Sequence, residues 1–322
     1  MPNYQQFRDS TEHLDNHNRL SEILVEDGYI LIRGLVDPER ALRVKRDIMA
    51  ILREHHILEE DCVDEPKWSG GPHPTEAEYM RFYDKVVRLD SFNALAESPE
   101  IIALAEGVTG DKTKCWTQRL FRVMYPDPDA PAGTGVGAQQ DGNPQFGYEA
   151  PAFYTCWLPL MDIDAKMGGL AVSPGSHKLG MLEHAGAAAP SSVKTMKTKG
   201  FGLDASKIPW ATGDFHPGDA ILFTNLTAHH GLINRSDRIR MSCDFRYQST
   251  TGSASWLADM MGPDIRRIGQ QIDELLAGRA IYVTTHADQA TLDRVRRLML
   301  AEQATTLQRA QELIAGLQAS ES

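Results

Sequence analysis

The sequence predicts a mainly β domain, either a sandwich or a barrel, with helical segments before and after it in the chain. Four segments in the middle are short, rich in β-branched and aromatic residues, and separated by turns that contain glycine, proline and aspartate. Apolar residues on either side of this region recur instead at helical spacing. The four predicted strands are residues 153–163, 170–172, 220–228 and 239–247.

The N-terminal part of the chain is predicted to add one strand and two helical stretches. Residues 28–36 are apolar and rich in β-forming side chains, so we expect a strand there. Asp37 and Pro38 predict the start of a helix, because aspartate caps free backbone amides and proline fits the first turn. Residues 62–75, rich in proline, glycine and charge, predict a loop, and residues 76–105 predict a second helical stretch.

Two further segments lie outside the predicted strands. Residues 181–215 predict a long insertion, which with the loop at 62–75 is a candidate substrate lid. Residues 292–317 carry an apolar stripe at helical spacing, which packs either on the core or against a second copy in a homo-oligomer. We expect a single domain over residues 1–322. Its core lies at about 110–250, its N-terminal helices at about 15–105 and a C-terminal helical extension at about 256–318.

The composition restricts the kinds of partner. The 322 residues have a formal net charge of -11, which argues against nucleic acid and anionic membranes, since both bind basic patches. The four cysteines include no C-x-x-C pair, and residues 1–20 lack the apolar stretch of a secretory signal. No run of about 18 apolar residues is present to span a bilayer. We therefore expect a cytoplasmic protein.

Two pairs of polar side chains indicate chemistry. Asp141 follows a loop rich in proline and glycine, and His229 lies 88 residues later (229 minus 141) at the end of an apolar segment. A carboxylate and imidazoles on neighbouring strands of a small barrel are typical of an iron site with open coordination positions. Arg240 and Ser242 lie two residues apart in a predicted strand, so they project from one face and can bind a carboxylate. Singly, each residue also has an ordinary structural explanation, such as a turn or a surface ion pair.

Longer motifs around these residues resemble those of a known enzyme family. Residues 138–142, AQQDG, look like an H-x-D-G element with glutamine in place of histidine. Residues 157–160, WLPL, and 168–177, GGLAVSPGSH, are similar to a W-x-P-L … G-G-L-x-x-x-P-G-S-H stretch. The residues that match a C-terminal H-x4-N-x5-R-x-S signature are Gly218, Asp219, His229, Asn234, Arg240, Ser242, Arg246 and Tyr247. Over residues 28–249 the chain thus resembles the phytanoyl-CoA dioxygenase (PhyH) family of iron(II)- and 2-oxoglutarate-dependent oxygenases.

The resemblance implies a fold and roles for single residues. The fold is a double-stranded β-helix, the jelly roll of cupin-like proteins. Asp141 and His229 would ligate iron(II), and Arg240 with Ser242 would bind the distal carboxylate of 2-oxoglutarate. Gln118 resembles a position that helps hold the keto-acid end of this cosubstrate.

Two other histidines are less suited to ligate the metal. His230 is an alternative ligand, but the family spacing to Asn234 and Arg240 fits His229 without a gap. His177, within the P-G-S-H turn, is expected to be structural. The implied reaction couples decarboxylation of 2-oxoglutarate to oxidation of a small-molecule substrate by O2, usually by hydroxylation.

Gln139 departs from the family pattern, which has histidine there as the first iron ligand. An amide oxygen is a weaker donor to iron(II) than an imidazole nitrogen. Three interpretations remain open: a naturally divergent enzyme with altered or impaired reactivity, a fold that has lost oxidation, or a glutamine introduced by substitution to trap a complex.

Two rival functions follow from these interpretations. One is a non-catalytic protein that binds 2-oxoglutarate or another small molecule on the same fold. The other is a cupin isomerase or epimerase that uses the metal as a Lewis acid, which would leave Arg240 and Ser242 without a purpose. Because Asp141, His229, Arg240 and Ser242 are all present, we predict an oxygenase.

Overall fold

The computed structural model describes residues 4–129, 138–142, 152–182 and 208–250. The chain divides into two compact units, and the first, residues 1–115 and 119–253, contains every helix and strand named below. No helix within the described ranges is long and apolar enough to cross a membrane. The predicted helical extension at 256–318 and most of the predicted insertion at 181–215 lie outside the described residues.

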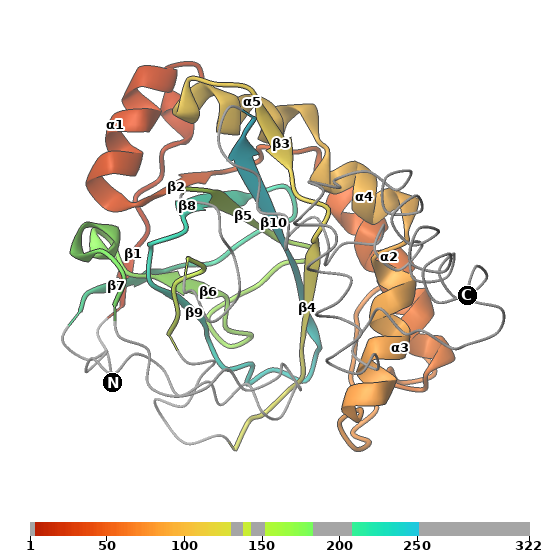
Figure 1. Cartoon of the computed structure of the whole chain (residues 1–322). Coiled ribbons are helices and arrows are strands. Elements are labelled where there is room, and N and C mark those ends of the chain that lie inside the picture. The colour runs from red at the N-terminus through yellow and green to blue at the C-terminus, as the bar shows by residue number, and fades with distance from the viewer. Residues whose placement is uncertain (1–3, 130–137, 143–151, 183–207, 251–322) are drawn as a thin grey trace, which may run out of the picture. The chain divides into compact units, whose positions relative to one another are not determined.

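The strands of the first unit form two sheets (Figure 1). The larger has the order β2-β8-β5-β10-β3, with β4 also paired to β10, and the smaller has the order β1-β7-β6-β9. All pairings are antiparallel except that of β1 with β7. The bounds are β1 Tyr4–Gln6, β2 Tyr29–Ile32, β3 Thr113–Cys115, β4 Leu120–Met124, β5 Tyr154–Pro159, β6 Leu170–Val172, β7 Trp210–Thr212, β8 Ala220–Thr224, β9 His229–Gly231 and β10 Arg240–Ser249.

The inner faces of the two sheets are turned toward each other. The ring of Phe223 in β8 lies 4.7 Å from that of His229 in β9, measured between centroids. The Arg240 guanidinium of β10 reaches across to the backbone carbonyl of Gly169, just before β6, at 3.1 Å. Two facing, mainly antiparallel sheets joined in this way form the double-stranded β-helix, or jelly roll, that the sequence predicted.

Within the part of the chain that the structure describes, five α-helices accompany the sheets, and several pack on the outer face of the larger one. They are α1 His17–Asp27, α2 Pro38–Glu54, α3 Glu76–Val86, α4 Asp90–Ala96 and α5 Pro99–Thr109. The ring of Phe92 in α4 lies 5.2 Å from that of Phe245, and the Tyr247 hydroxyl donates to the carbonyl of Ala96 at 2.6 Å. Since side chains alternate along a strand, the odd-numbered residues of β10 face the helices and the even-numbered ones face the barrel interior.

Several predicted elements are confirmed and one is corrected. Strands occur within three of the four predicted segments and within 28–36, and β10, predicted for 239–247, runs on to Ser249. Helix α2 begins as predicted, with the Asp37 carboxylate accepting from the amide of Glu39 at 3.0 Å. The single helical stretch predicted for 76–105 is wrong, because α3, α4 and α5 are separate helices. The backbone turns extended at Leu89 and again at Ser98, and Pro99 then starts α5 in the first-turn position that suits proline.

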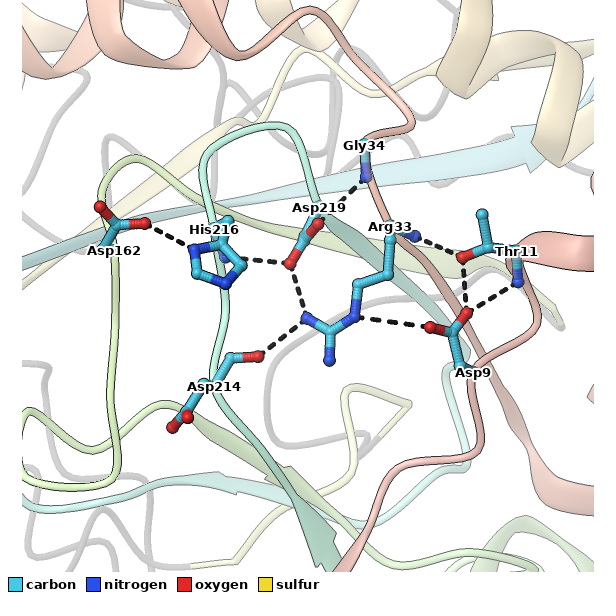
Figure 2. A network of polar contacts seen from close by, with 8 residues as sticks. All are labelled: Asp9, Thr11, Arg33, Gly34, Asp162, Asp214, His216 and Asp219. Carbon is cyan, nitrogen blue, oxygen red and sulfur yellow. Dashed lines mark hydrogen bonds and ion pairs between the residues drawn. The ribbon is translucent and has the colours of Figure 1, made fainter.

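A polar network fixes the start of β8 to the end of β2 (Figure 2). The buried Asp219 carboxylate accepts from the Arg33 guanidinium at 2.6 Å and from the backbone amides of Gly34 and His216 at 3.0 and 2.9 Å. Gly218 has a positive φ of 96°, and a Cβ there would lie 2.5 Å from the carbonyl oxygen of Val36. Gly218 therefore permits the close approach of two backbone segments, and Asp219 fixes the position at which β8 begins.

Candidate active site

Three side chains predicted at the metal site lie together. The Nε2 atom of His229 is 3.6 Å from Oδ1 of Asp141 and 3.3 Å from the amide nitrogen of Gln139. Gln139 and His229 also exchange two backbone hydrogen bonds of 2.9 Å each, as an isolated antiparallel bridge. This bridge brings the 138–142 segment against β9, although the two are 90 residues apart in the chain.

The Asp141 carboxylate is held on its second oxygen. The Thr155 hydroxyl donates to Oδ2 at 2.6 Å, and the Arg246 guanidinium lies 3.3 Å from the same oxygen. Burial alone would raise the pKa of the Asp141 carboxyl, but the Arg246 charge and the smaller contributions of other neighbours lower the pKa to about 2. The carboxylate is therefore ionised at neutral pH, with Oδ1 turned toward His229.

The His229 ring is oriented by the backbone. Its Nδ1 lies 3.0 Å from the carbonyl oxygen of Thr227, which can only accept, so Nδ1 carries the proton in the neutral ring. The Nε2 lone pair is then directed toward Asp141 and Gln139. A backbone partner on one ring nitrogen and a free lone pair on the other is the usual arrangement of a metal-binding histidine.

The positions of these donor atoms suit a divalent cation, although an amide oxygen is a weaker donor than an imidazole nitrogen. Two ligand atoms about 2.1 Å from an octahedral metal and at right angles lie about 3 Å apart, close to the separations of 3.3 and 3.6 Å measured here. Within the described ranges, no three His, Cys, Asp or Glu side chains gather to hold a metal. Gln139 has its amide nitrogen beside His229, so it could offer Oε1 to a metal only after the amide turns.

A second group on β10 fits a carboxylate. Arg240 donates to the carbonyls of Gly168 and Gly169, while its Nε is buried and has no hydrogen-bond partner among the described residues. The buried hydroxyl of Ser242 also lacks a partner within this part of the chain. Burial lowers the pKa of Arg240 to about 10, so the guanidinium stays charged at neutral pH. Unsatisfied buried donors are costly, and a bound carboxylate would satisfy both.

The remaining candidates lie elsewhere or stay predictions. His230 projects away from Asp141, since it contacts the Trp210 ring at 4.5 Å and lies 3.5 Å from the Tyr4 hydroxyl. His177 bonds the carbonyl of Val25 at 3.0 Å, as expected for a structural residue. Gln118 is buried and groups with the second compact unit, so its predicted role stays a prediction.

Sequence reasoning missed the residues that support the site. Thr155 received no role, because its partner Asp141 is brought to it by the fold. Arg246 was recognised only as a motif match. A signal was nevertheless present: Arg246 lies four residues after Ser242, so the alternation of a strand places both on one face.

Comparison with known proteins identifies the family of the chain. The model of the family described as phytanoyl-CoA dioxygenase (PhyH) matches residues 24–242. A 1-deoxypentalenic acid 11-beta-hydroxylase from Streptomyces arenae is 26% identical over 263 residues, covering 76% of this chain and 86% of the relative. The corresponding hydroxylase from Streptomyces exfoliatus is 26% identical over 260 residues, covering 74% of this chain and 84% of the relative.

A solved structure with the same fold supports the assignment of the architecture. The non-heme α-ketoglutarate-dependent carbocyclase from nogalamycin biosynthesis superposes with a TM-score of 0.50 at 18% identity, over 76% of this chain and 87% of the other. A non-heme monooxygenase in its apo form gives a TM-score of 0.50 at 16% identity, over 73% of this chain and 79% of the other. At these identities the likeness concerns the fold.

Proposed function

Since this chain belongs to the phytanoyl-CoA dioxygenase (PhyH) family of iron(II)- and 2-oxoglutarate-dependent oxygenases, we propose which of its residues hold the two cofactors. The chain is an oxygenase of this class, acting on a small molecule, as predicted. Asp141 and His229 bind iron(II), and Arg240 with Ser242 binds the distal carboxylate of 2-oxoglutarate. The observation that carries the proposal is the approach of Asp141 Oδ1 to His229 Nε2 at 3.6 Å inside the barrel.

The protein's own part in the reaction is to orient and to exclude water. Arg246 and Thr155 hold the Asp141 carboxylate ionised and leave Oδ1 for the metal. The Thr227 carbonyl keeps the His229 ring in the tautomer whose Nε2 can ligate. Bound iron with 2-oxoglutarate supplies the activation of O2 and the oxidation of an unactivated C–H bond, which side chains alone cannot perform.

Gln139, in this proposal, occupies the position of the family's first iron-ligand histidine. Its backbone bridge to His229 and the 3.3 Å approach of its amide support that placement. Because disturbing groups that only hydrogen-bond to metal ligands lowers metal affinity or activity about 10–100-fold, replacing an imidazole ligand by an amide should weaken iron binding at least as much. The site would then hold iron weakly without 2-oxoglutarate.

The substrate is proposed to be a small organic molecule that is hydroxylated at carbon. The support is the likeness to two relatives named as hydroxylases of 1-deoxypentalenic acid. No nucleic-acid partner is proposed, in keeping with the net charge of -11.

Binding measurements under anaerobic conditions test the two assignments separately. We expect Mn(II), used as a redox-inert substitute for iron(II), to bind the purified protein and to bind Asp141→Ala at least about 10-fold more weakly. We expect Arg240→Ala to weaken 2-oxoglutarate binding by about 10–100-fold, since a charge-assisted fork is lost. His230→Gln is the control and should change neither affinity. Equal dissociation constants for the Arg240→Ala variant and the unsubstituted chain would remove the cosubstrate assignment.

An aerobic assay separates oxygenase activity from a binding function. We expect succinate to form from 2-oxoglutarate when iron(II) is saturating, slowly in the absence of substrate. Protein that binds both ligands and yields no succinate at saturating iron(II), with or without a hydroxylase substrate, would favour the rival of a non-catalytic binding protein.

A further inference from the structure

Arg122 is an inward-facing arginine that the proposed metal and cosubstrate sites do not use. It lies in β4 directly opposite Ser242 of β10 in the antiparallel register. Opposed residues of paired strands project from the same face, so Arg122 shares the barrel interior with Ser242 and Arg240.

One edge of the Arg122 guanidinium is held by a hydrogen bond, and the other edge has no partner among the described residues. Its Nε donates to Oδ2 of Asp244 at 2.6 Å. Asp244 is its one hydrogen-bonding or ion-pairing partner within the described residues, and the Arg122 side chain is 24% exposed. A guanidinium held through Nε presents its two terminal nitrogens as a fork that matches a carboxylate. Asp244 therefore orients Arg122 without occupying the fork.

A tyrosine three residues after this arginine offers a further donor. The hydroxyl of Tyr125, just after β4, is buried and lacks a hydrogen-bond partner among the residues that the structure describes. Its ring lies 4.9 Å from His73 and 6.1 Å from Trp68, forming an aromatic wall. A buried hydroxyl without a protein partner is suited to donate to a ligand.

The charge balance indicates what kind of ligand the site would bind. On the inner faces of β4 and β10 and at the 138–142 segment, the described residues include three arginines and two carboxylates. They are Arg122, Arg240, Arg246, Asp141 and Asp244. A divalent metal and the dianion of 2-oxoglutarate cancel each other, so one positive charge is left over in a largely buried space. An anionic group on the substrate would balance it.

We propose that Arg122 binds a carboxylate of the substrate, with Tyr125 as an additional donor and Asp244 as the positioning residue. The two carboxylates of 2-oxoglutarate already have partners, one at Arg240 and Ser242 and the other at the metal. The inference rests on the proposed function in that it takes the barrel interior as the substrate site.

A matched pair of probes tests the proposal, with decanoate as the carboxylate and decanamide as its uncharged equivalent. Their dissociation constants are measured by calorimetry, with and without Mn(II) and 2-oxoglutarate. The main variant combines Arg122→Met with Asp244→Asn, so that no buried carboxylate is left unpaired. Arg19→Met, an exposed arginine paired with Glu22 on α1, is the control. Circular dichroism and the thermal midpoint report whether each variant is folded.

We expect the unsubstituted chain to prefer decanoate over decanamide by about 10-fold or more, the usual effect of hydrogen bonds to a charged group. The double variant should lose this preference, while its affinities for decanamide and 2-oxoglutarate stay within about twofold. If the double variant does not fold, Arg122→Lys replaces it and should reduce the preference several-fold, since it keeps the charge and loses the fork.

Three results would overturn the proposal: no preference for decanoate in the unsubstituted chain, a preference that survives in the folded variant, or a tenfold loss of 2-oxoglutarate affinity. The last would assign Arg122 to the cosubstrate. A chain that prefers decanoate through Arg122 yet binds neither Mn(II) nor 2-oxoglutarate would instead contradict the proposed function alone.

Discussion

Replacing Gln139 by histidine is the most direct probe of the metal site. The backbone at 139 is already fixed by its two hydrogen bonds to His229, and the amide nitrogen reaches within 3.3 Å of His229 Nε2. A histidine Nε2 lies about as far from Cα as that amide nitrogen, so the new imidazole can reach the same point. We therefore expect Gln139→His to supply a third strong donor without movement of the chain.

The expected gain follows from the kind of ligand that is added. Changes to groups that hydrogen-bond to metal ligands alter metal affinity about 10–100-fold, so an imidazole that binds the metal directly should raise the affinity by at least that factor, about 1.4–2.7 kcal/mol or more. Anaerobic titration with Mn(II), followed by electron paramagnetic resonance, measures the change. Succinate release without substrate should rise in parallel at sub-saturating iron(II).

A size-matched control separates ligation from packing. Gln139→Leu keeps a similar volume and offers no donor, so its Mn(II) affinity should fall below that of the unsubstituted chain. If Gln139→His and Gln139→Leu bind Mn(II) equally, position 139 does not contribute to the metal site and the reasoning from the bridge is refuted.

Three further predictions concern the supports of the site and the fold. Thr155→Val removes the 2.6 Å hydrogen bond to Asp141 and should weaken Mn(II) binding about 10-fold, measured by the same titration, with unchanged 2-oxoglutarate affinity. Asp219→Ala leaves the amide of Gly34 without its partner and should lower the free energy of unfolding by about 2–4 kcal/mol in urea denaturation; a loss below about 0.5 kcal/mol would contradict the role given to this network. Leu222→Ala opens a cavity in the core of β8 and should cost about 2–5 kcal/mol in the same experiment, whereas Val25→Ala, on the exposed side of α1, should cost little.

The elements that were predictable from sequence are those with a strong local signal. Strand β6 has the predicted bounds, Leu170–Val172, because a glycine pair precedes it and a proline turn follows. Helix α2 was recognisable from its capping aspartate and first-turn proline. Strands β1 and β9 have only three residues each, and their pairing depends on distant partners, so no local pattern marks them.

The residues of the candidate site also divide into those that a local motif marks and those that only the fold brings together. Asp141 and His229 were found because motif spacing marks them, and the structure brings them together. Their supports come from strands far away in the chain and carry no local signal, as with Thr155, whose hydroxyl meets Asp141 only after β5 is in place. The contact between Arg122 and Asp244 likewise depends on the register of β4 against β10, which alternation alone does not determine.

Strand β10 fixes the spacing of charged side chains in the barrel interior. Arg240 lies at one end of the strand. Arg246, which contacts the Asp141 carboxylate, follows six residues later, about 20 Å further along the backbone. Because both faces of the strand are buried, a slip of one residue would turn every inward charge into the apolar layer under the helices. A longer or shorter ligand can therefore be accommodated by substitution of side chains, and not by a shift in the register of β10.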